Sequence, residues 1–122
     1  MEDYQFSFEK LRGRQQARKW VVEVYRLTAD FPKTGTYNLV SQLDRAAVSV
    51  VANLAEGSGR FTGKEPDRFS SLAHSSLMET ACLQTIARDL GFLADEDYQL
   101  QRKQISEISN PINAHRSKQT QS

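Results

Sequence analysis

The fold of this chain is decided by the stretch at residues 42–60, QLDRAAVSVVANLAEGSGR. Apolar residues recur here at three- and four-residue steps, which is the spacing of one face of an α-helix. They are Leu43, Ala46, Ala47, Val50 and Leu54. A helix that is apolar around most of its circumference needs burial on more than one side. We therefore expect it to pack inside a helical bundle and the bundle to associate with other copies of itself.

The same helix keeps a narrow polar line, which falls within an arc of about 90°. The candidate site residues on this line are Arg45, Ser49, Asn53, Glu56 and Arg60. One interpretation is a phosphate site, held by the two arginines and oriented by Asn53 and Glu56. The other, which we favour, is a structural hydrogen-bond network between helices or subunits, because buried polar groups need partners and arginine pairs well with glutamate.

Three further helices are predicted around this one. The first runs from about Phe8 to Asp30 and ends because Pro32 disfavours a helical residue before it. Thr36 or Asn38 caps the second helix, and the third begins near Pro66 and ends at Leu90-Gly91-Phe92, which resembles a Schellman cap. The fourth starts in the acidic segment 95–97, because negative charge is favourable at a helix N-terminus.

Each of these helices has an apolar stripe at helical spacing. The stripes are Trp20, Val21, Val24, Leu27 and Thr28 in the first helix, Phe69, Leu72, Ala73, Ser76, Thr80, Leu83, Ile86, Ala87 and Leu90 in the third, and Tyr98, Ile105, Ile108 and Ile112 in the fourth. Four amphipathic segments joined by short connections favour an all-α, up-down-up-down four-helix bundle.

The bundle is predicted as a single domain over residues 1–114. Pro111 is expected to kink or end the last helix. The remainder, residues 115–122, has no apolar side chain and is predicted to be a disordered tail.

Composition narrows the classes of function. The 16 basic and 15 acidic residues give a net charge of +1, which implies no strong attraction to nucleic acid or to a membrane surface. A single cysteine excludes an intrachain disulfide and suits a reducing compartment. The N-terminal Met1-Glu2-Asp3 lacks the pattern of a signal peptide, and no apolar run is long enough to span a bilayer. We therefore expect a cytoplasmic protein without a membrane partner.

One basic run is the candidate site for nucleic acid. It consists of Lys10, Arg12, Arg14, Arg18 and Lys19, with no acidic residue between them. Repeated in an oligomer, such a patch would gain avidity for a long anion such as RNA. The alternative is a solvated helix face, which the absence of interleaved aromatic residues favours.

No catalytic, metal-binding or cofactor-binding constellation is predicted. A di-iron bundle needs Glu-x-x-His motifs on facing helices, and the chain has two histidines, neither in that motif. His74 and Cys82 are about 12 Å apart along one helix, which is too far for a thiol–base pair. No glycine loop has the spacing of a phosphate-binding loop. We expect no cofactor, no metal and no enzyme activity.

At the level of motifs the chain resembles a bacterial four-helix-bundle family. The motifs are FP at 31–32, QL at 42–43, RAAVSV at 45–50, AN at 52–53, AEG at 55–57 and GR at 59–60, and the match continues to the LGF stop at 90–92. This family includes the proteins encoded by intervening sequences in 23S ribosomal RNA genes and the accessory variability protein of diversity-generating retroelements. The resemblance implies a four-helix protomer in a ring-like homopentamer. In the retroelement branch it also implies binding to a reverse transcriptase and RNA.

Two functions follow as expectations. The first is a non-catalytic cytoplasmic scaffold that forms a homo-oligomer and presents a surface to a protein partner. The second is an RNA-binding accessory module that uses the basic run of the first helix. Near-neutral charge favours the scaffold.

Overall fold

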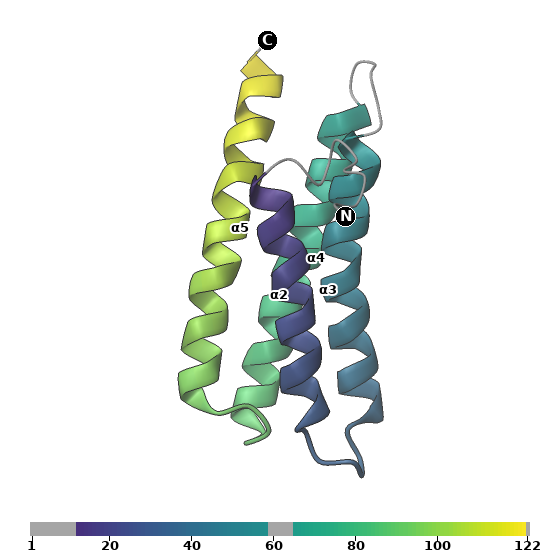
Figure 1. The fold of residues 1–122 in the computed structure, drawn as a ribbon, viewed down its shortest axis with the longest axis vertical. Coiled ribbons are helices and arrows are strands. Elements are labelled where there is room, and N and C mark those ends of the chain that lie inside the picture. Colours follow the sequence, from purple (N-terminus) through teal and green to yellow (C-terminus); the bar gives the residue numbers. More distant parts are fainter. Residues whose placement is uncertain (1–11, 59–64, 122) are drawn as a thin grey trace, which may run out of the picture.

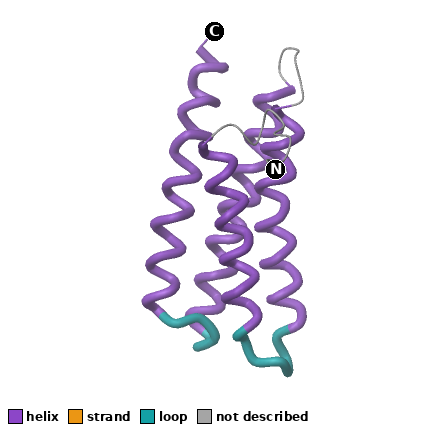
Figure 2. Tube along the Cα trace, in the orientation of Figure 1, coloured by secondary structure: helices purple, strands orange, loops and turns teal. Residues whose placement is uncertain are grey.

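The computed structural model describes the chain over residues 12–58 and 65–121, and the side chains over residues 15–57 and 68–113. The described residues form helices α2 (Arg12–Ala29), α3 (Tyr37–Ser58), α4 (Glu65–Asp89) and α5 (Asp95–Gln121), and no strand. The helices run alternately up and down along a common axis (Figure 1). Figure 2 shows both described connections, residues 30–36 and 90–94, at the same end of the molecule. The predicted four-helix bundle is confirmed.

The core is built from the stripes that the helical periodicity predicts. The apolar stripe of α3 is fully buried, with no member more than 6% exposed. Trp20 and Val24 of α2 and Tyr98, Ile105, Ile108 and Ile112 of α5 are also buried in this core. Because each stripe faces the same interior, the four helices share one hydrophobic core.

Helix α4 departs from its predicted stripe. Leu72, Ile86 and Leu90 are 42%, 42% and 57% exposed, whereas Leu77 and Gln84, which the stripe does not include, are buried. The reason is that α4 has apolar residues on its outer face as well as on its inner face. Periodicity alone does not tell which of two apolar faces turns inward.

The predicted end of α4 is confirmed. Gly91 has a φ of 81°, and its amide donates to the carbonyl of Arg88, while the amide of Phe92 donates to the carbonyl of Ala87. These two bonds are the Schellman pattern, and the left-handed backbone is the conformation that glycine adopts without strain. The turn positions Phe92 next to Phe31, with ring centroids 6.1 Å apart.

Helix α3 begins after Thr36, whose carbonyl accepts from the amide of Val40. This is one of the two caps expected from the sequence. The Thr36 hydroxyl donates to the carbonyl of Pro32, so it fastens the turn between α2 and α3 rather than the first turn of α3.

Helix α5 does not end at Pro111, which lies inside it. The helix continues to Gln121, where the sequence predicts a disordered tail from residue 115. The segment contains neither glycine nor a second proline, and its Lys, Arg and Gln residues are good helix formers. An existing helix extends into such residues without a new nucleation step.

The helices do not pack equally. Among neighbouring helices, α3 and α4 make the most extensive contact, and α2 and α5 make the least. Small buried residues, Ala46 and Ala47 in α3 and Ala73 in α4, allow the close approach of the first pair. The fourth side of the bundle, between α2 and α5, is therefore its most open side.

Candidate functional site

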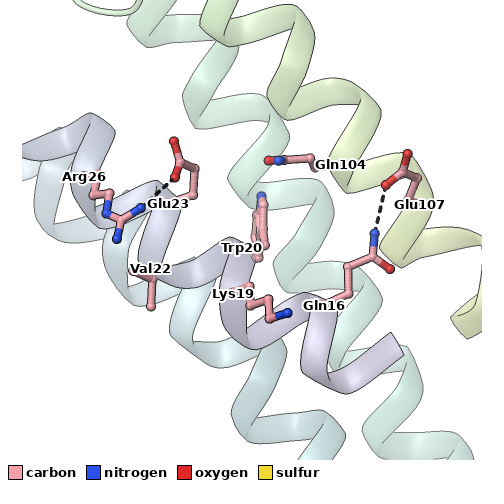
Figure 3. Close-up of a pocket in the computed structure, with 8 residues that line it drawn as sticks. All are labelled: Gln16, Lys19, Trp20, Val22, Glu23, Arg26, Gln104 and Glu107. Carbon is pink, nitrogen blue, oxygen red and sulfur yellow. Dashed lines mark hydrogen bonds and ion pairs between the residues drawn. The ribbon is translucent and has the colours of Figure 1, made fainter. Parts of the chain in front are cut away.

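A groove of about 510 Å³ lies on the open side of the bundle, between α2 and α5 (Figure 3). The residues that line it come from both helices and are mostly polar. They are Gln16, Lys19, Trp20, Val22, Glu23, Arg26, Gln104 and Glu107. The groove exists because the two helices that border it contact each other so little.

The floor of the groove is held by a chain of buried amides. The indole nitrogen of Trp20 and the side-chain nitrogen of Gln84 both donate to Gln101 Oε1, at 2.9 and 2.7 Å. The Gln101 nitrogen donates in turn to Gln104 Oε1 at 3.0 Å, at the wall of the groove. Gln84 and Gln101 are each 1% exposed, so these bonds satisfy groups that water does not reach. The chain of bonds ties α2 and α4 to α5.

The sequence interpretation missed Gln84 and Gln101, because glutamine is usually a surface residue. The signal available in the sequence is their register. Gln101 lies four residues before Ile105 and three after Tyr98, which is the spacing of the buried stripe of α5.

The charges in the groove are balanced. Lys19 and Arg26 contribute two positive charges, and Glu23 and Glu107 contribute two negative ones. Arg26 lies 3.5 Å from Glu23, and the Gln16 amide donates to Glu107 at 2.8 Å. A surface with this mixture offers hydrogen bonds of both kinds and little net field, so it does not select for a polyanion.

The predicted basic run lies only partly within the residues whose side chains the structure describes. Lys10 lies outside the described residues, and Arg12 and Arg14 are in α2 with side chains that are not described. Arg18 and Lys19 are exposed on α2, and Lys19 lines the groove. The structure therefore shows two of the five basic side chains of this run, both accessible.

The predicted polar line of α3 contains an interhelix hydrogen-bond network at two of its residues. The Asn53 amide donates to the carbonyl of Ser49 at 2.8 Å and to its hydroxyl at 3.1 Å. The Ser49 hydroxyl lies 2.8 Å from the hydroxyl of Ser76 in α4. Arg45 and Glu56 are exposed on the same helix, and Arg60 lies outside the described residues. Two of the five residues are thus brought into one network that joins α3 to α4.

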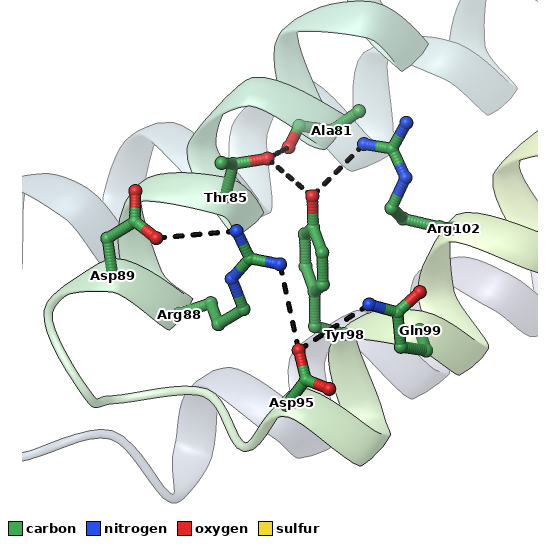
Figure 4. Close-up of polar contacts among 8 residues, drawn as sticks. All are labelled: Ala81, Thr85, Arg88, Asp89, Asp95, Tyr98, Gln99 and Arg102. Atoms are coloured by element: carbon green, nitrogen blue, oxygen red, sulfur yellow. Dashed lines mark hydrogen bonds and ion pairs between the residues drawn. The ribbon is translucent and has the colours of Figure 1, made fainter.

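A second polar cluster holds the corner between α4 and α5 (Figure 4). The ring of Tyr98 lies 4.0 Å from the guanidinium carbon of Arg88, and its hydroxyl bonds to Thr85 at 3.0 Å and Arg102 at 3.1 Å. The hydrogen bond with Thr85 lowers the pKa of Tyr98 below its ordinary value of 10.0, burial opposes this change, and the hydrogen bond from Arg102 and the charges of Arg102 and Arg88 add to the lowering. Arg88 also lies 3.6 Å from Asp95, so the cluster is internally neutralised and acts as a structural clamp.

An apolar ridge follows the outer face of helix α4 and ends at Leu90, the residue directly after the helix. We use the term α4 ridge for Met78, Cys82, Ile86 and Leu90, which follow one another at four-residue steps. All four are exposed, Met78 by 41%, Ile86 by 42% and Leu90 by 57%. Residues at this spacing form a continuous row along a helix, here about 18 Å long.

No group of three His, Cys, Asp or Glu residues that could hold a metal ion occurs in the described part of the chain. Within the same part, no helix has both the length and the apolar character that crossing a bilayer requires.

Comparison with known proteins agrees with the fold. The family model described as 23S rRNA-intervening sequence protein matches residues 9–114, which includes all four helices except the C-terminal end of α5. A search of curated proteins finds no match to the chain. The resemblance to the accessory protein of diversity-generating retroelements stays a prediction. The family match covers most of the sequence, and the chain therefore belongs to the 23S rRNA-intervening sequence protein family.

Proposed function

We propose that this protein is a non-catalytic cytoplasmic scaffold that assembles into a ring-like homopentamer and presents a surface to a protein partner. The observation that carries the proposal is the α4 ridge. Exposing four neighbouring apolar side chains to water is unfavourable, and another protein surface that covers them removes this cost.

The geometry of the α4 ridge suits packing against a helix of another copy. Rows at four-residue spacing are the rows that interdigitate when helices cross in the commonest packing class. In a ring, each copy uses two different surfaces, one to give and one to receive the contact. The α4 ridge supplies one of them and leaves the groove between α2 and α5 available for a partner.

The groove supports a protein rather than a polyanion as that partner. Its charges cancel, and its lining combines polar groups, such as Gln104 and Glu107, with the exposed Val22. Mixed polar and apolar surface of this kind is typical of non-obligate protein interfaces.

Light scattering coupled to size-exclusion chromatography tests the assembly. The unmodified protein should elute with about five times the mass of one chain, and Ile86→Glu should lower this mass, because it places a charge in the middle of the α4 ridge. Leu100→Glu is the matched control, since Leu100 is 51% exposed on α5 and away from the α4 ridge. A monomeric unmodified protein at micromolar concentration, or equal masses for Ile86→Glu and the unmodified protein, would contradict the proposal.

An RNA-binding module is the second candidate, favoured by the exposure of Arg18 and Lys19. Fluorescence anisotropy with a structured RNA at low and physiological salt separates the two candidates. Binding that weakens as salt rises and is lost when Lys10, Arg14 and Arg18 are changed together to alanine would favour this module. No binding at low salt would leave the protein scaffold.

A further inference from the structure

A second hollow, of about 310 Å³, lies where α2 turns into α3. Several of its lining residues belong to the connection 30–36, which Figure 2 shows at one end of the bundle. Three aromatic side chains, Tyr25, Phe31 and Tyr37, contribute to its wall, and its charged lining residues are Asp44 and Lys33. We call this feature the corner hollow.

The carboxylate of Asp44 is half-buried and has no cationic partner among the described residues. Its Oδ1 accepts a 2.9 Å hydrogen bond from the hydroxyl of Thr28. Burial raises the pKa of Asp44 above its ordinary value of 3.8, and the bond from Thr28 opposes that change. The corner hollow therefore holds a partly desolvated negative charge that a cation would stabilise.

The positive charge of Lys33 is engaged by the end of α2 and not by Asp44. Helix α2 ends at Ala29, and the last carbonyls of a helix carry partial negative charge. The chain already places one ammonium group there, because Lys33 Nζ donates to the carbonyl of Ala29 at 2.8 Å. Lys33 thus occupies the helix end, and among the side chains that the structure describes none forms a salt bridge with the Asp44 carboxylate.

The aromatic residues favour a planar cation. Tyr37 is 83% exposed and Tyr25 is 46% exposed, which leaves both rings accessible to a ligand. The faces of aromatic rings attract cations, and a guanidinium group both stacks on rings and forms forked hydrogen bonds with a carboxylate. A divalent metal is a poorer fit, since it requires several oxygen ligands and the hollow offers one carboxylate.

We propose that the corner hollow binds an arginine side chain of a protein partner, with Asp44 as its counter-ion and the rings of Tyr25 and Tyr37 flanking the guanidinium group. This inference rests on the proposed function, because it names the chemistry of the protein partner that binds the scaffold. It assigns to the partner a positively charged contact residue.

Saturation-transfer NMR on the full chain tests the site, with an acetylated and amidated Gly-Arg-Gly peptide as the probe. The control probe carries citrulline in place of arginine, which keeps the shape of the side chain and removes its charge. The arginine peptide should bind saturably, and the citrulline peptide about fivefold more weakly, as expected for a partly exposed ion pair. Asp44→Asn should reduce binding of the arginine peptide by the same factor.

Two further variants provide a second test of the site and a control. Tyr37→Ala should weaken binding about threefold through the loss of a cation–π contact, and it should leave folding intact because the Tyr37 side chain is exposed. Asp30→Asn removes a neighbouring exposed carboxylate that does not line the corner hollow, and should leave binding unchanged. Equal binding of the two peptides, or equal weakening by Asp30→Asn and Asp44→Asn, would overturn the proposal.

Light scattering on the same samples separates this inference from the proposed assembly. A pentamer that does not distinguish arginine from citrulline overturns the arginine site and leaves the scaffold intact. A monomer that does distinguish them overturns the assembly and leaves the arginine site intact.

Discussion

The indole nitrogen of Trp20 donates a 2.9 Å hydrogen bond to the side-chain oxygen of Gln101, and this bond joins the two neighbouring helices that contact each other least. Gln101 Oε1 also accepts from Gln84, so one buried oxygen serves donors from α2 and α4. A polar junction of this kind depends on each member, because a donor left without an acceptor in a buried site keeps its full desolvation cost. It also explains how α2 stays in register with α5 across an open groove.

We predict that Gln101→Leu lowers the free energy of unfolding by about 2–4 kcal/mol, because it leaves the donors of Trp20 and Gln84 buried without an acceptor. Urea denaturation at a fixed protein concentration measures the change. Gln99→Leu, at an exposed position of the same helix, should change the stability by less than about 0.5 kcal/mol. The double variant Gln84→Leu, Gln101→Leu should lose less than the sum of the two single variants, since it removes one of the orphaned donors. Additive losses would show that the three residues do not act as one network.

Leu54→Ala should lower the free energy of unfolding by about 2–5 kcal/mol, because Leu54 is only 6% exposed and its truncation leaves a cavity in the core. Val48→Ala, at a 44% exposed position of the same helix, provides the contrast and should cost less than about 1 kcal/mol. Thermal or urea denaturation followed by circular dichroism reads both values. Similar losses for the two variants would mean that the outer face of α3 is also buried, as it would be in an interface between copies.

The burial of a helix face could be predicted from the sequence where the helix has a single apolar face. The stripes of α2 and α5 were predictable because each of these helices has one apolar face, so the helical period determines which side is buried. In α4 the same reasoning assigned Ile86 and Leu90 to the stripe, because a helix with two apolar faces satisfies the pattern in more than one orientation.

The polar features depend on contacts between distant segments. Gln84 and Gln101 are seventeen residues apart, and nothing local marks their side chains as partners. The corner hollow depends on the turn that brings Tyr25 and Tyr37 to Asp44. Helix positions were predictable from the sequence, and the pairings across helices required the structure.

Asp44→Asn should raise the stability of the free protein at neutral pH. The pKa of Asp44 is raised in the folded state, so the fold favours the protonated carboxyl over the carboxylate. The contribution of the protonated Asp44 side chain to folding stability is complete below its unfolded pKa of 3.8 and is lost as the pH rises through its folded pKa. Asparagine is neutral at every pH and still accepts a hydrogen bond from Thr28. The gain in stability from Asp44→Asn should therefore appear only as the pH rises above the unfolded pKa of Asp44.

Denaturation of Asp44→Asn and the unmodified protein between pH 3 and pH 7 measures this difference. The two unfolding free energies should differ most near neutral pH and converge in acid. A variant that is less stable at neutral pH would show that the carboxylate makes a net favourable interaction in the free protein. That result would contradict an unpaired charge in the corner hollow.

The last prediction concerns the turn between α4 and α5. Gly91→Ala should lower the free energy of unfolding by about 1 kcal/mol, because the φ of 81° is strained for a residue with a Cβ atom. No heavy atom lies within 4 Å of the position that this Cβ would take, so the cost is one of backbone conformation and not of a clash. Gly91→Asn should cost about half as much, since asparagine tolerates the left-handed region better. Thermal denaturation of the two variants orders them, and equal losses would show that the turn changes conformation instead of accepting the strain.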